Sequence, residues 1–351
     1  AMTASKIEWT DRSDWNPIRG CTRVSQGCTH CYAESIAARF SAAGQPFHGF
    51  ARRTSQGPRW TGKVNVIWER AFLPLTWRKP VKIFASSTSD FFHEALNPFD
   101  VASLFGVMIA AHHLRGHTFQ VLTKRPERMA EWLNNPDWWV AVNAEARAHV
   151  MERTDPLNRR SDDARATLSD YRPDNPPPGI WLGCSMEDQQ SAESRRAAFE
   201  AVPAAVKFIS YEPALGPLDL GGIRASRDAD GEVYLHDAFI TGIDWVICGG
   251  ESGRGARPMH PDWARSMRDQ CVAAGVPFFM KQWGEWAPGE IAGDYLNPER
   301  PAKGISLFDG TWSECWSEVD GHYDDEPDLY RVGKARAGRL LDGREWAEFP
   351  A

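Results

Sequence analysis

Three cysteines lie within eleven residues near the start of the sequence, at Cys21, Cys28 and Cys31. A cysteine thiolate is both a nucleophile and a metal ligand. Gly20 and Gly27 stand directly before two of these cysteines, and glycine lets a loop bend closely around a bound group. Three thiolates on one short loop can hold a metal centre and leave one coordination position for a molecule that is not protein. We expect the chemistry of this protein at that open position.

Two simpler uses of these cysteines explain the spacing less well. A structural zinc ion needs four ligands, which usually come as two close pairs. Only Cys28 and Cys31 form a close pair, while His30 lies between them and His48 follows no pattern. A redox dithiol formed by the same pair would leave Cys21 without a role. A 4Fe–4S cluster held by three thiolates keeps one iron free, and the spacing favours this interpretation.

The composition limits the class of protein. With 42% hydrophobic and 25% charged residues, the chain has the make-up of an ordinary globular protein. It has no apolar run long enough for a membrane span, so we expect no membrane association. Its seven cysteines lack a paired spacing and no export signal is recognisable, which favours a reducing cytoplasm over a disulfide framework.

The charge balance bears on possible partners. The net charge is −7 and the isoelectric point is near 5.8. A broad nucleic-acid footprint usually needs a basic excess, because contacts with phosphates supply most of the non-specific affinity. The overall balance therefore weighs against such a footprint. It leaves room for a local basic cleft, to which Arg52–Arg53, Lys124–Arg125 and Arg195–Arg196 could belong.

From residue 80 onward the sequence alternates between short apolar runs and segments with helical spacing of apolar residues. The runs suit parallel strands buried on both faces, at Val81–Ala85, Thr118–Leu122, Ile180–Gly183, Val206–Ile209, Trp245–Cys248 and Pro277–Met280. The segments between them include the expected helices Val101–Leu114, Gln190–Val202 and Asp262–Ala274. An earlier strand at Trp15–Ile18 and a helix at Ala33–Ala43 flank the cysteines. This alternation predicts an α/β fold, a partial (β/α) barrel of the TIM type with about six to seven parallel strands.

Each apolar run is followed by a few polar residues, which we call the tip of the expected strand. The tips are residues 86–90, 123–125, 185–187, 210–212, 249–252 and 281–283. In a parallel barrel all such tips lie on one rim, and active sites form on that rim. The cysteine loop follows the first expected strand and belongs to the same rim. We expect this convergence to form the functional site.

Two polar inserts and a tail depart from the pattern. The inserts span residues 44–79 and about 135–179, and polar stretches of that length are usually functional lids or disordered segments. From about residue 284 the sequence becomes rich in Gly, Trp and Asp without the strand–helix alternation. We therefore divide the chain into a barrel over residues 1–284 and a C-terminal extension or small cap over residues 285–351.

The cysteine spacing C-x6-C-x2-C resembles the cluster loop of the radical S-adenosylmethionine (SAM) superfamily, where C-x3-C-x2-C is commonest. An aromatic residue often precedes the last cysteine in that superfamily; here His30 precedes Cys31 and Tyr32 follows it. The order of motifs over residues 6–284 is similar to that of a phage and bacterial family of radical-SAM-like proteins of largely unknown function. The resemblance rests on residues 9–10, 15–17, 21–34, 89–93, 122–128, 210–213, 249–253 and 281–284.

The resemblance implies a 4Fe–4S cluster on Cys21, Cys28 and Cys31, with SAM chelating the free iron. Reductive cleavage of SAM would then give a 5′-deoxyadenosyl radical that takes hydrogen from a substrate. Among the tips, Asp90 is the candidate for the SAM ammonium, Lys124 or Arg125 for the carboxylate, and Ser185 with Glu187 for the ribose. Gly249 and Gly250 would allow close approach to adenine. The full set of expected SAM contacts is Tyr32, Ser86, Thr88, Asp90, Lys124, Ser185, Glu187, Ser210, Gly249, Gly250, Glu251, Lys281 and Gln282.

The substrate side of the site is less determined. We expect Tyr211 and Glu212 in catalysis and Cys184 or Cys248 as a hydrogen-atom donor, with an ion pair between Glu212 and Arg257 as the alternative role of that carboxylate. The leading hypothesis is modification or repair of a nucleic acid or nucleotide, with flavodoxin or ferredoxin as reductant. Modification of a peptide or small metabolite is a second enzymatic hypothesis. A non-catalytic iron–sulfur or zinc protein that binds a partner is the third.

Overall fold

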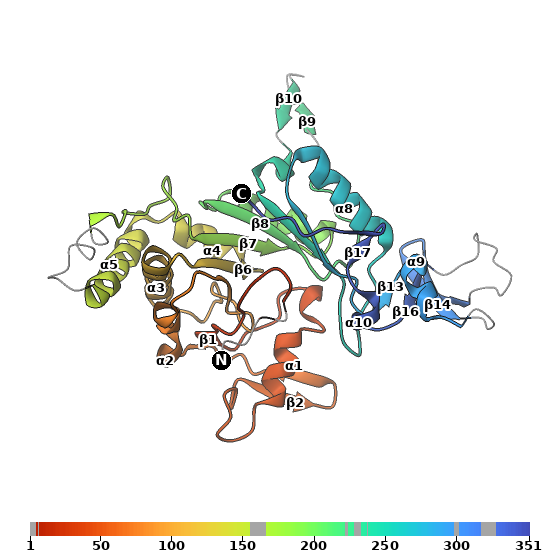
Figure 1. Ribbon diagram of the computed structural model, residues 1–351, viewed down its shortest axis with the longest axis horizontal. Coiled ribbons are helices and arrows are strands. Elements are labelled where there is room, and N and C mark those ends of the chain that lie inside the picture. Colours follow the sequence, from red (N-terminus) through yellow and green to blue (C-terminus); the bar gives the residue numbers. More distant parts are fainter. Residues whose placement is uncertain are drawn as a thin grey trace. The chain divides into compact units, whose positions relative to one another are not determined.

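The computed structural model describes residue 5 and residues 7–154, 166–221, 224–227, 233–236, 238–297, 302–316 and 328–351. Within these residues, six parallel strands form one sheet in the order β12-β11-β8-β7-β6-β5. The sheet curls into a half-barrel flanked by helices (Figure 1). The expected α/β fold, a partial TIM-like barrel, is confirmed.

The six strands are the six apolar runs predicted from the sequence. They are β5 (Lys82–Ala85), β6 (Thr118–Thr123), β7 (Ile180–Ser185), β8 (Val206–Tyr211), β11 (Trp245–Gly249) and β12 (Phe278–Gln282). All residues of β7 and β11 are buried, as expected for strands covered on both faces. β5 pairs in parallel with β6, and β6 with β7, so their polar ends lie along one edge.

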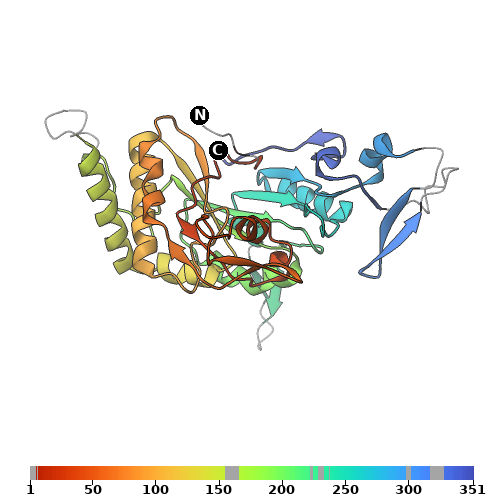
Figure 2. The same cartoon turned by 90° about the horizontal axis from the view of Figure 1, so that it is seen from below.

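The predicted helices are confirmed as α3 (Pro98–Arg115), α7 (Gln189–Glu200) and α8 (Pro261–Ala274). α3 begins where the Asn97 side chain accepts a hydrogen bond from the Phe99 N–H, and it ends at Gly116, which has φ 72°. Asparagine before and glycine after a helix satisfy its free backbone groups. Figures 1 and 2 both show α5 (Pro136–Arg153) beside α3.

The second insert was wrongly expected to be polar loop throughout, because α5 occupies its first half. Trp138 and Trp139 are buried on this helix, and the Trp138 ring packs edge-on against Phe105 of α3. The first insert also contains regular structure: β2 (Ala51–Thr54), β3 (Gly57–Trp60), β4 (Asn65–Val66), α2 (Trp68–Ala71) and η2 (Leu73–Thr76).

The expected first strand and helix need correction. β1 covers only Ile18–Arg19 and pairs antiparallel with β4, outside the parallel sheet. The residues before it do run beside β5, because Phe84 N–H donates to the Arg12 carbonyl and Ser86 N–H to that of Trp15. The helix after the cysteines, α1 (Tyr32–Arg39), is shorter than predicted.

The chain forms two compact units. The first comprises Ala1–Ser185 and Arg195–Phe208, and the second comprises Met186–Ser194 and Ile209–Ala351. The division falls within the sheet, so it differs from the proposed boundary at residue 284. In the second unit, β13 (Trp286–Ala287), β16 (Leu329–Arg331), β14 (Lys303–Phe308) and β15 (Thr311–Trp316) form an antiparallel sheet.

Shorter elements complete the second unit: β9 (Arg224–Arg227) paired with β10 (Val233–His236), η3 (Phe239–Gly242), α9 (Gly289–Ala292), η4 (Gly293–Tyr295), α10 (Lys334–Ala337), and β17 (Leu340–Leu341) paired with β18 (Arg344–Glu345). The end of the chain lies along β12, where Met280 N–H donates to the Trp346 carbonyl. No helix in the described ranges is long and apolar enough to cross a membrane.

Candidate functional site

The three cysteines lie on a loop between β1 and α1 in the first unit. Cys28 ends a single turn of 3-10 helix, η1 (Gln26–Cys28), and Cys31 is the N-cap residue directly before α1. Gly20 has φ 93°, and a Cβ atom on it would lie 1.9 Å from the Lys63 carbonyl oxygen. Gly20 is therefore needed where the loop crosses the first insert. Gly27 lies within η1.

All three thiols are free and partly buried. Burial together with the Asp90 charge raises the pKa of Cys21 to about 12, whereas the Arg125 guanidinium acts in the opposite direction. Burial also raises the pKa of Cys31. Hydrogen bonds from the backbone N–H groups at the start of α1 and the charge of Lys124 act to lower it. The other two thiols contribute to the raised pKa of Cys21. The three sulfur atoms thus lie within electrostatic reach of one another.

A single metal ion is a different case from a cluster. Among the described residues, no group of three or more His, Cys, Asp or Glu side chains converges closely enough to hold one ion. In a 4Fe–4S cluster each thiolate binds a different iron atom, so the three sulfurs do not meet at one point. His48 is exposed and its ring lies 3.2 Å from the Ser41 carbonyl oxygen.

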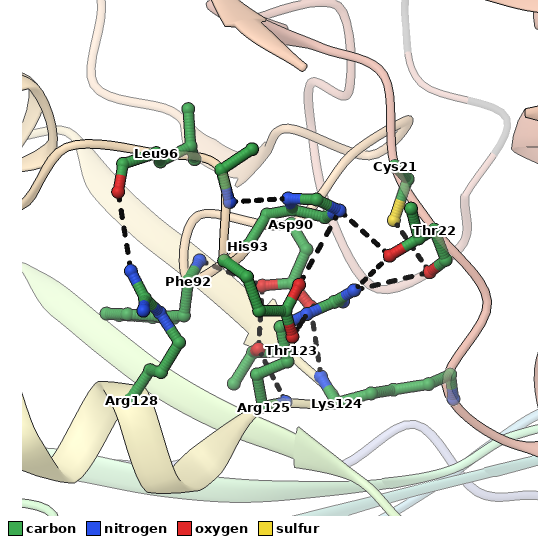
Figure 3. Close-up of polar contacts among 12 residues, drawn as sticks. Cys21, Thr22, Asp90, Phe92, His93, Leu96, Thr123, Lys124, Arg125 and Arg128 are labelled. Atoms are coloured by element: carbon green, nitrogen blue, oxygen red, sulfur yellow. Dashed lines mark hydrogen bonds and ion pairs between the residues drawn. The ribbon is translucent and has the colours of Figure 1, made fainter. Parts of the chain in front are cut away.

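The cysteine loop is anchored through Thr22, the residue after Cys21 (Figure 3). Arg125 donates from Nη2 to Thr22 Oγ1 at 2.8 Å and to the Thr22 carbonyl at 3.3 Å. His93 Nε2 lies 2.9 Å from the same hydroxyl oxygen. The tip of β6 and the segment after β5 therefore both hold the backbone beside Cys21.

The direction of the His93 contact follows from its other ring nitrogen. The backbone N–H of Ala95 can only donate, and it lies 3.1 Å from His93 Nδ1. Nδ1 must then be the unprotonated nitrogen, and the proton on Nε2 is donated to Thr22. Burial lowers the pKa of His93, and the nearby Arg125 charge lowers it further. The ring is therefore neutral near pH 7 and fixed in one tautomer.

A buried ion pair supports this anchor. Arg125 Nη1 lies 3.0 Å from Asp90 Oδ2, and both side chains are almost fully buried. Arg125 Nε also donates to Glu94 at 2.7 Å. Burial acts to lower the pKa of Arg125, but the two carboxylates outweigh it and the pKa is raised. Arg125 is thus a charged connector between β6, the segment after β5 and the cysteine loop.

The predicted roles of Asp90 and Arg125 in binding SAM need correction. Asp90 Oδ1 accepts hydrogen bonds from the Phe92 N–H and the Thr123 hydroxyl, and Oδ2 accepts from the Lys124 N–H as well as from Arg125. A carboxylate with four donors has no remaining strong site for an ammonium group. Asp90 and Arg125 are positioning residues, and the charge of Lys124 acts on Cys31.

The tip of β5 lies against the residues before the cysteine loop. Asn16 accepts hydrogen bonds at its side-chain oxygen from the Ser87 hydroxyl and from the N–H and hydroxyl of Thr88. Tyr32, half exposed, donates its hydroxyl to the Ser87 carbonyl. Ser86 is buried in the left-handed conformation at φ 52°, and its hydroxyl has no hydrogen-bond partner among the described residues. Such strain often marks a functional position.

The catalytic role of Tyr211 stays a prediction, and its contacts give it a structural role. Tyr211 ends β8, is fully buried and donates its hydroxyl to the Gly216 carbonyl. Burial raises its pKa well above the usual range. Tyr211 therefore fixes the loop after β8.

Cys184 and Cys248 are also fully buried, and burial raises the pKa of Cys248. A neutral thiol is the form that can give a hydrogen atom, so this role stays a prediction.

The second unit contains two ion pairs at strand ends. Lys281 Nζ lies 2.5 Å from Glu212, whereas Arg257 binds Glu251 through two side-chain nitrogens at 2.7 and 3.0 Å. The alternative pairing of Glu212 with Arg257 is therefore wrong: each residue has a different partner.

Gly250 is required by the chain itself, because a Cβ there would lie 2.0 Å from the Trp283 carbonyl oxygen. This close approach explains the glycine at position 250 without the predicted role beside adenine. Gln282 donates to the Gly250 carbonyl, and its buried side-chain oxygen has no partner in the described part of the chain. Ser185, Glu187 and Ser210 are buried, and no SAM contact follows from their geometry alone.

Sequence reasoning missed Thr22, His93 and Glu94. His93 and Glu94 follow Asp90 in the same polar segment, and Thr22 follows Cys21, so their positions were a usable signal. Arg125 binds Thr22 and Glu94 directly and meets His93 only through the Thr22 hydroxyl, and this arrangement depends on the fold.

Comparison with known proteins gives a family but no activity. No curated protein matches the chain, and no solved structure matches it. One family model, described as "Protein of unknown function (DUF5131)", matches residues 4–350. Because this match covers nearly the whole sequence, the chain belongs to the DUF5131 family.

Proposed function

We propose that this protein is a radical SAM enzyme that binds a 4Fe–4S cluster through Cys21, Cys28 and Cys31. One observation carries the proposal: three free, partly buried thiols share one loop and lie within electrostatic reach of one another. The loop is fixed at Thr22 by the buried Arg125–Asp90 pair. Three thiolates on one anchored loop suit a cluster with one iron open to a ligand.

The surrounding charges fit this group. Iron–sulfur clusters are bound by thiolates, and burial alone opposes the charged form of Cys21 and Cys31. Arg125 and Lys124 act against that effect, and a bound metal centre acts in the same direction as these two cations. The donor set therefore fits a metal centre.

When bound, a reduced cluster would supply one electron for cleavage of the SAM sulfonium to methionine and an adenosyl radical, which would become 5′-deoxyadenosine by taking a hydrogen atom from a substrate. The chain's own residues bind and orient SAM. We assign Lys124 to its carboxylate, since a fixed cation suits that group. We assign the Ser86 hydroxyl to its ammonium, because this buried oxygen has no other partner in the described residues.

The remaining expected contacts stay proposals. They are Tyr32, Thr88, Ser185, Glu187, Ser210, Gly249, Glu251, Lys281 and Gln282. The proposed reductant is flavodoxin or ferredoxin in the cytoplasm, and the proposed substrate is a nucleic acid or nucleotide. A peptide or small metabolite is the second candidate, which the acidic net charge favours.

The test is anaerobic reconstitution with iron and sulfide, followed by incubation with SAM and dithionite. We expect 5′-deoxyadenosine from the wild type and none from Cys21→Ser, Cys28→Ser or Cys31→Ser. Cys315→Ser is the matched control, because Cys315 is also partly buried but lies on β15. A colourless zinc protein, or product formation that survives loss of Cys21, would contradict the proposal.

A further inference from the structure

Basic residues are concentrated in the segment that contains the three cysteines. Residues 18–67 hold seven Arg or Lys residues and a single acidic residue, Glu34, and so carry a charge of +6. The whole chain has a net charge of −7. All of this segment lies in the first unit. A charge asymmetry of this size indicates a surface for an anionic partner.

The arginines of this segment differ from those elsewhere in their ion pairing. Glu34 is buried and is already used by Arg23 and by the Trp60 N–H. No ion pair is found in the described part of the chain for the other basic residues of the segment, which are Arg19, Arg39, Arg52, Arg53, Arg59 and Lys63. Elsewhere arginines commonly have carboxylate partners, as in the pairs of Arg12, Arg147, Arg196 and Arg265.

The β2–β3 ribbon places two of these arginines directly opposite each other. Arg52 pairs with Arg59 across the ribbon, so both side chains lie on the same face. The other face carries Ala51 and Trp60, which pack on Ala37 of α1. Like charges directly opposite on paired strands are destabilising. An anion between the two guanidinium groups removes that cost.

Helix α1 exposes a row of apolar side chains beside the ribbon. Tyr32, Ile36 and Phe40 are 49%, 39% and 40% exposed, and they follow one another at intervals of four residues. The row begins directly after Cys31. Arg39 is exposed next to Phe40. The Arg39 guanidinium lies over the Phe40 ring, 5.4 Å from its centroid. Aromatic rings together with guanidinium groups are the combination that binds single-stranded nucleic acid, through stacked bases and phosphate contacts.

We propose that the ribbon and the exposed row of α1 bind a single-stranded nucleic acid as the substrate of the neighbouring cysteine site. The term substrate rests on the proposed function, whereas the binding itself does not. Charge complementarity and the exposed rings favour a strand with unpaired bases over an acidic protein, which would use the charges but not the stacking positions. The acidic remainder of the chain confines such binding to this surface.

The test measures binding of fluorescent 15-nucleotide single-stranded DNA and RNA to the full chain over a salt series. Each phosphate contact on a single strand contributes about 0.7 to the slope of log K against log salt. Arg52→Gln/Arg59→Gln should lower the slope by about 1.4 and the affinity about 25-fold at 0.1 M salt. Phe40→Ala should weaken binding about five- to tenfold without changing the slope.

The matched control is Arg172→Gln/Arg344→Gln, which removes two exposed arginines outside the segment and should leave both slope and affinity unchanged. The preference between DNA and RNA identifies the kind of strand. The inference is overturned if the ribbon variant binds like the wild type, if duplex DNA binds more tightly than the single strand, or if poly-glutamate competes equally well. Iron content and release of 5′-deoxyadenosine without oligonucleotide are measured on the same samples, so failure of the cluster proposal is seen separately.

Discussion

At the scale of single residues, Arg125 determines how the cysteine loop is held. Its guanidinium binds Asp90, Glu94 and Thr22 in an almost fully buried position. A buried ion pair adds little to stability when it is intact, but removal of one partner leaves a buried charge. The pair therefore matters for the arrangement of the loop more than for net stability.

Replacement of Arg125 tests this view. Arg125→Gln should lower the free energy of unfolding by about 3–5 kcal/mol, because the Asp90 charge stays buried without a cation. Urea denaturation followed by circular dichroism measures the change. Arg147→Gln is the control, since Arg147 pairs with Asp170 at an exposed site and should cost at most about 1 kcal/mol. Equal effects of the two substitutions would show that the buried pair is not special.

Thr22 provides a sharper test of positioning. Thr22→Val keeps the shape of the side chain but removes the hydroxyl that accepts from His93 and Arg125. We expect about tenfold weaker iron retention after reconstitution, as for other residues that orient metal ligands. Iron released to a chelator measures this. Thr22→Ser retains the hydroxyl and should restore iron retention. Equal iron retention in the valine and serine variants would contradict the positioning role of the Thr22 hydroxyl.

Some residues of the site could be predicted from the sequence, and the roles of others could not. Three cysteines on one loop are visible from their spacing alone. The roles of Asp90, Lys124 and Arg125 could not be predicted in this way. The sequence shows that these residues follow strands, but it does not show which of their side chains point into the interior. From the sequence alone, Asp90 is expected to be a carboxylate available to a ligand. Only the fold brings four hydrogen-bond donors to it.

At the scale of elements, the six strands of the sheet were predictable, whereas the helix in the second insert was not. Six short apolar runs became the six strands, since burial on both faces leaves a clear sequence signal. Residues 12–15 lie along β5 without forming the expected strand, and α5 emerged where a loop was expected. Packing of Trp138 against α3 stabilises α5, and such tertiary contacts are not encoded in local spacing.

The crossing of the cysteine loop over the first insert gives a prediction at this scale. Gly20→Ala should destabilise the chain by more than the approximately 1 kcal/mol expected for a strained backbone conformation, because its Cβ would also collide with the Lys63 carbonyl. Gly62→Ala is the control: it has φ 88° but no atom within 4 Å of an added Cβ. Urea unfolding compares the two variants. A Gly20→Ala variant no less stable than Gly62→Ala would contradict the close approach.

At the scale of the whole molecule, the stability should depend on pH through buried histidines. Burial lowers the pKa of His117 and His149 below 6.5 in the folded chain. The unfolded chain therefore binds protons first as the pH falls below 6.5, and stability falls by at most about 1.4 kcal/mol per pH unit for each histidine.

Urea unfolding at pH 7.5, 6.5 and 5.5 measures this trend. His117→Asn/His149→Asn should reduce the dependence between pH 6.5 and 5.5 and leave the contribution of His93, whose pKa is also lowered by burial. If the double variant keeps the full dependence, other groups control it.

The central claim is that one iron of a cluster on Cys21, Cys28 and Cys31 is open to SAM. Electron paramagnetic resonance of the reconstituted, dithionite-reduced protein tests it most directly. The account predicts the signal of a reduced 4Fe–4S cluster that changes when SAM is added and disappears in the Cys21→Ser variant. A protein without a cluster signal, or with a signal that SAM leaves unchanged, would contradict it.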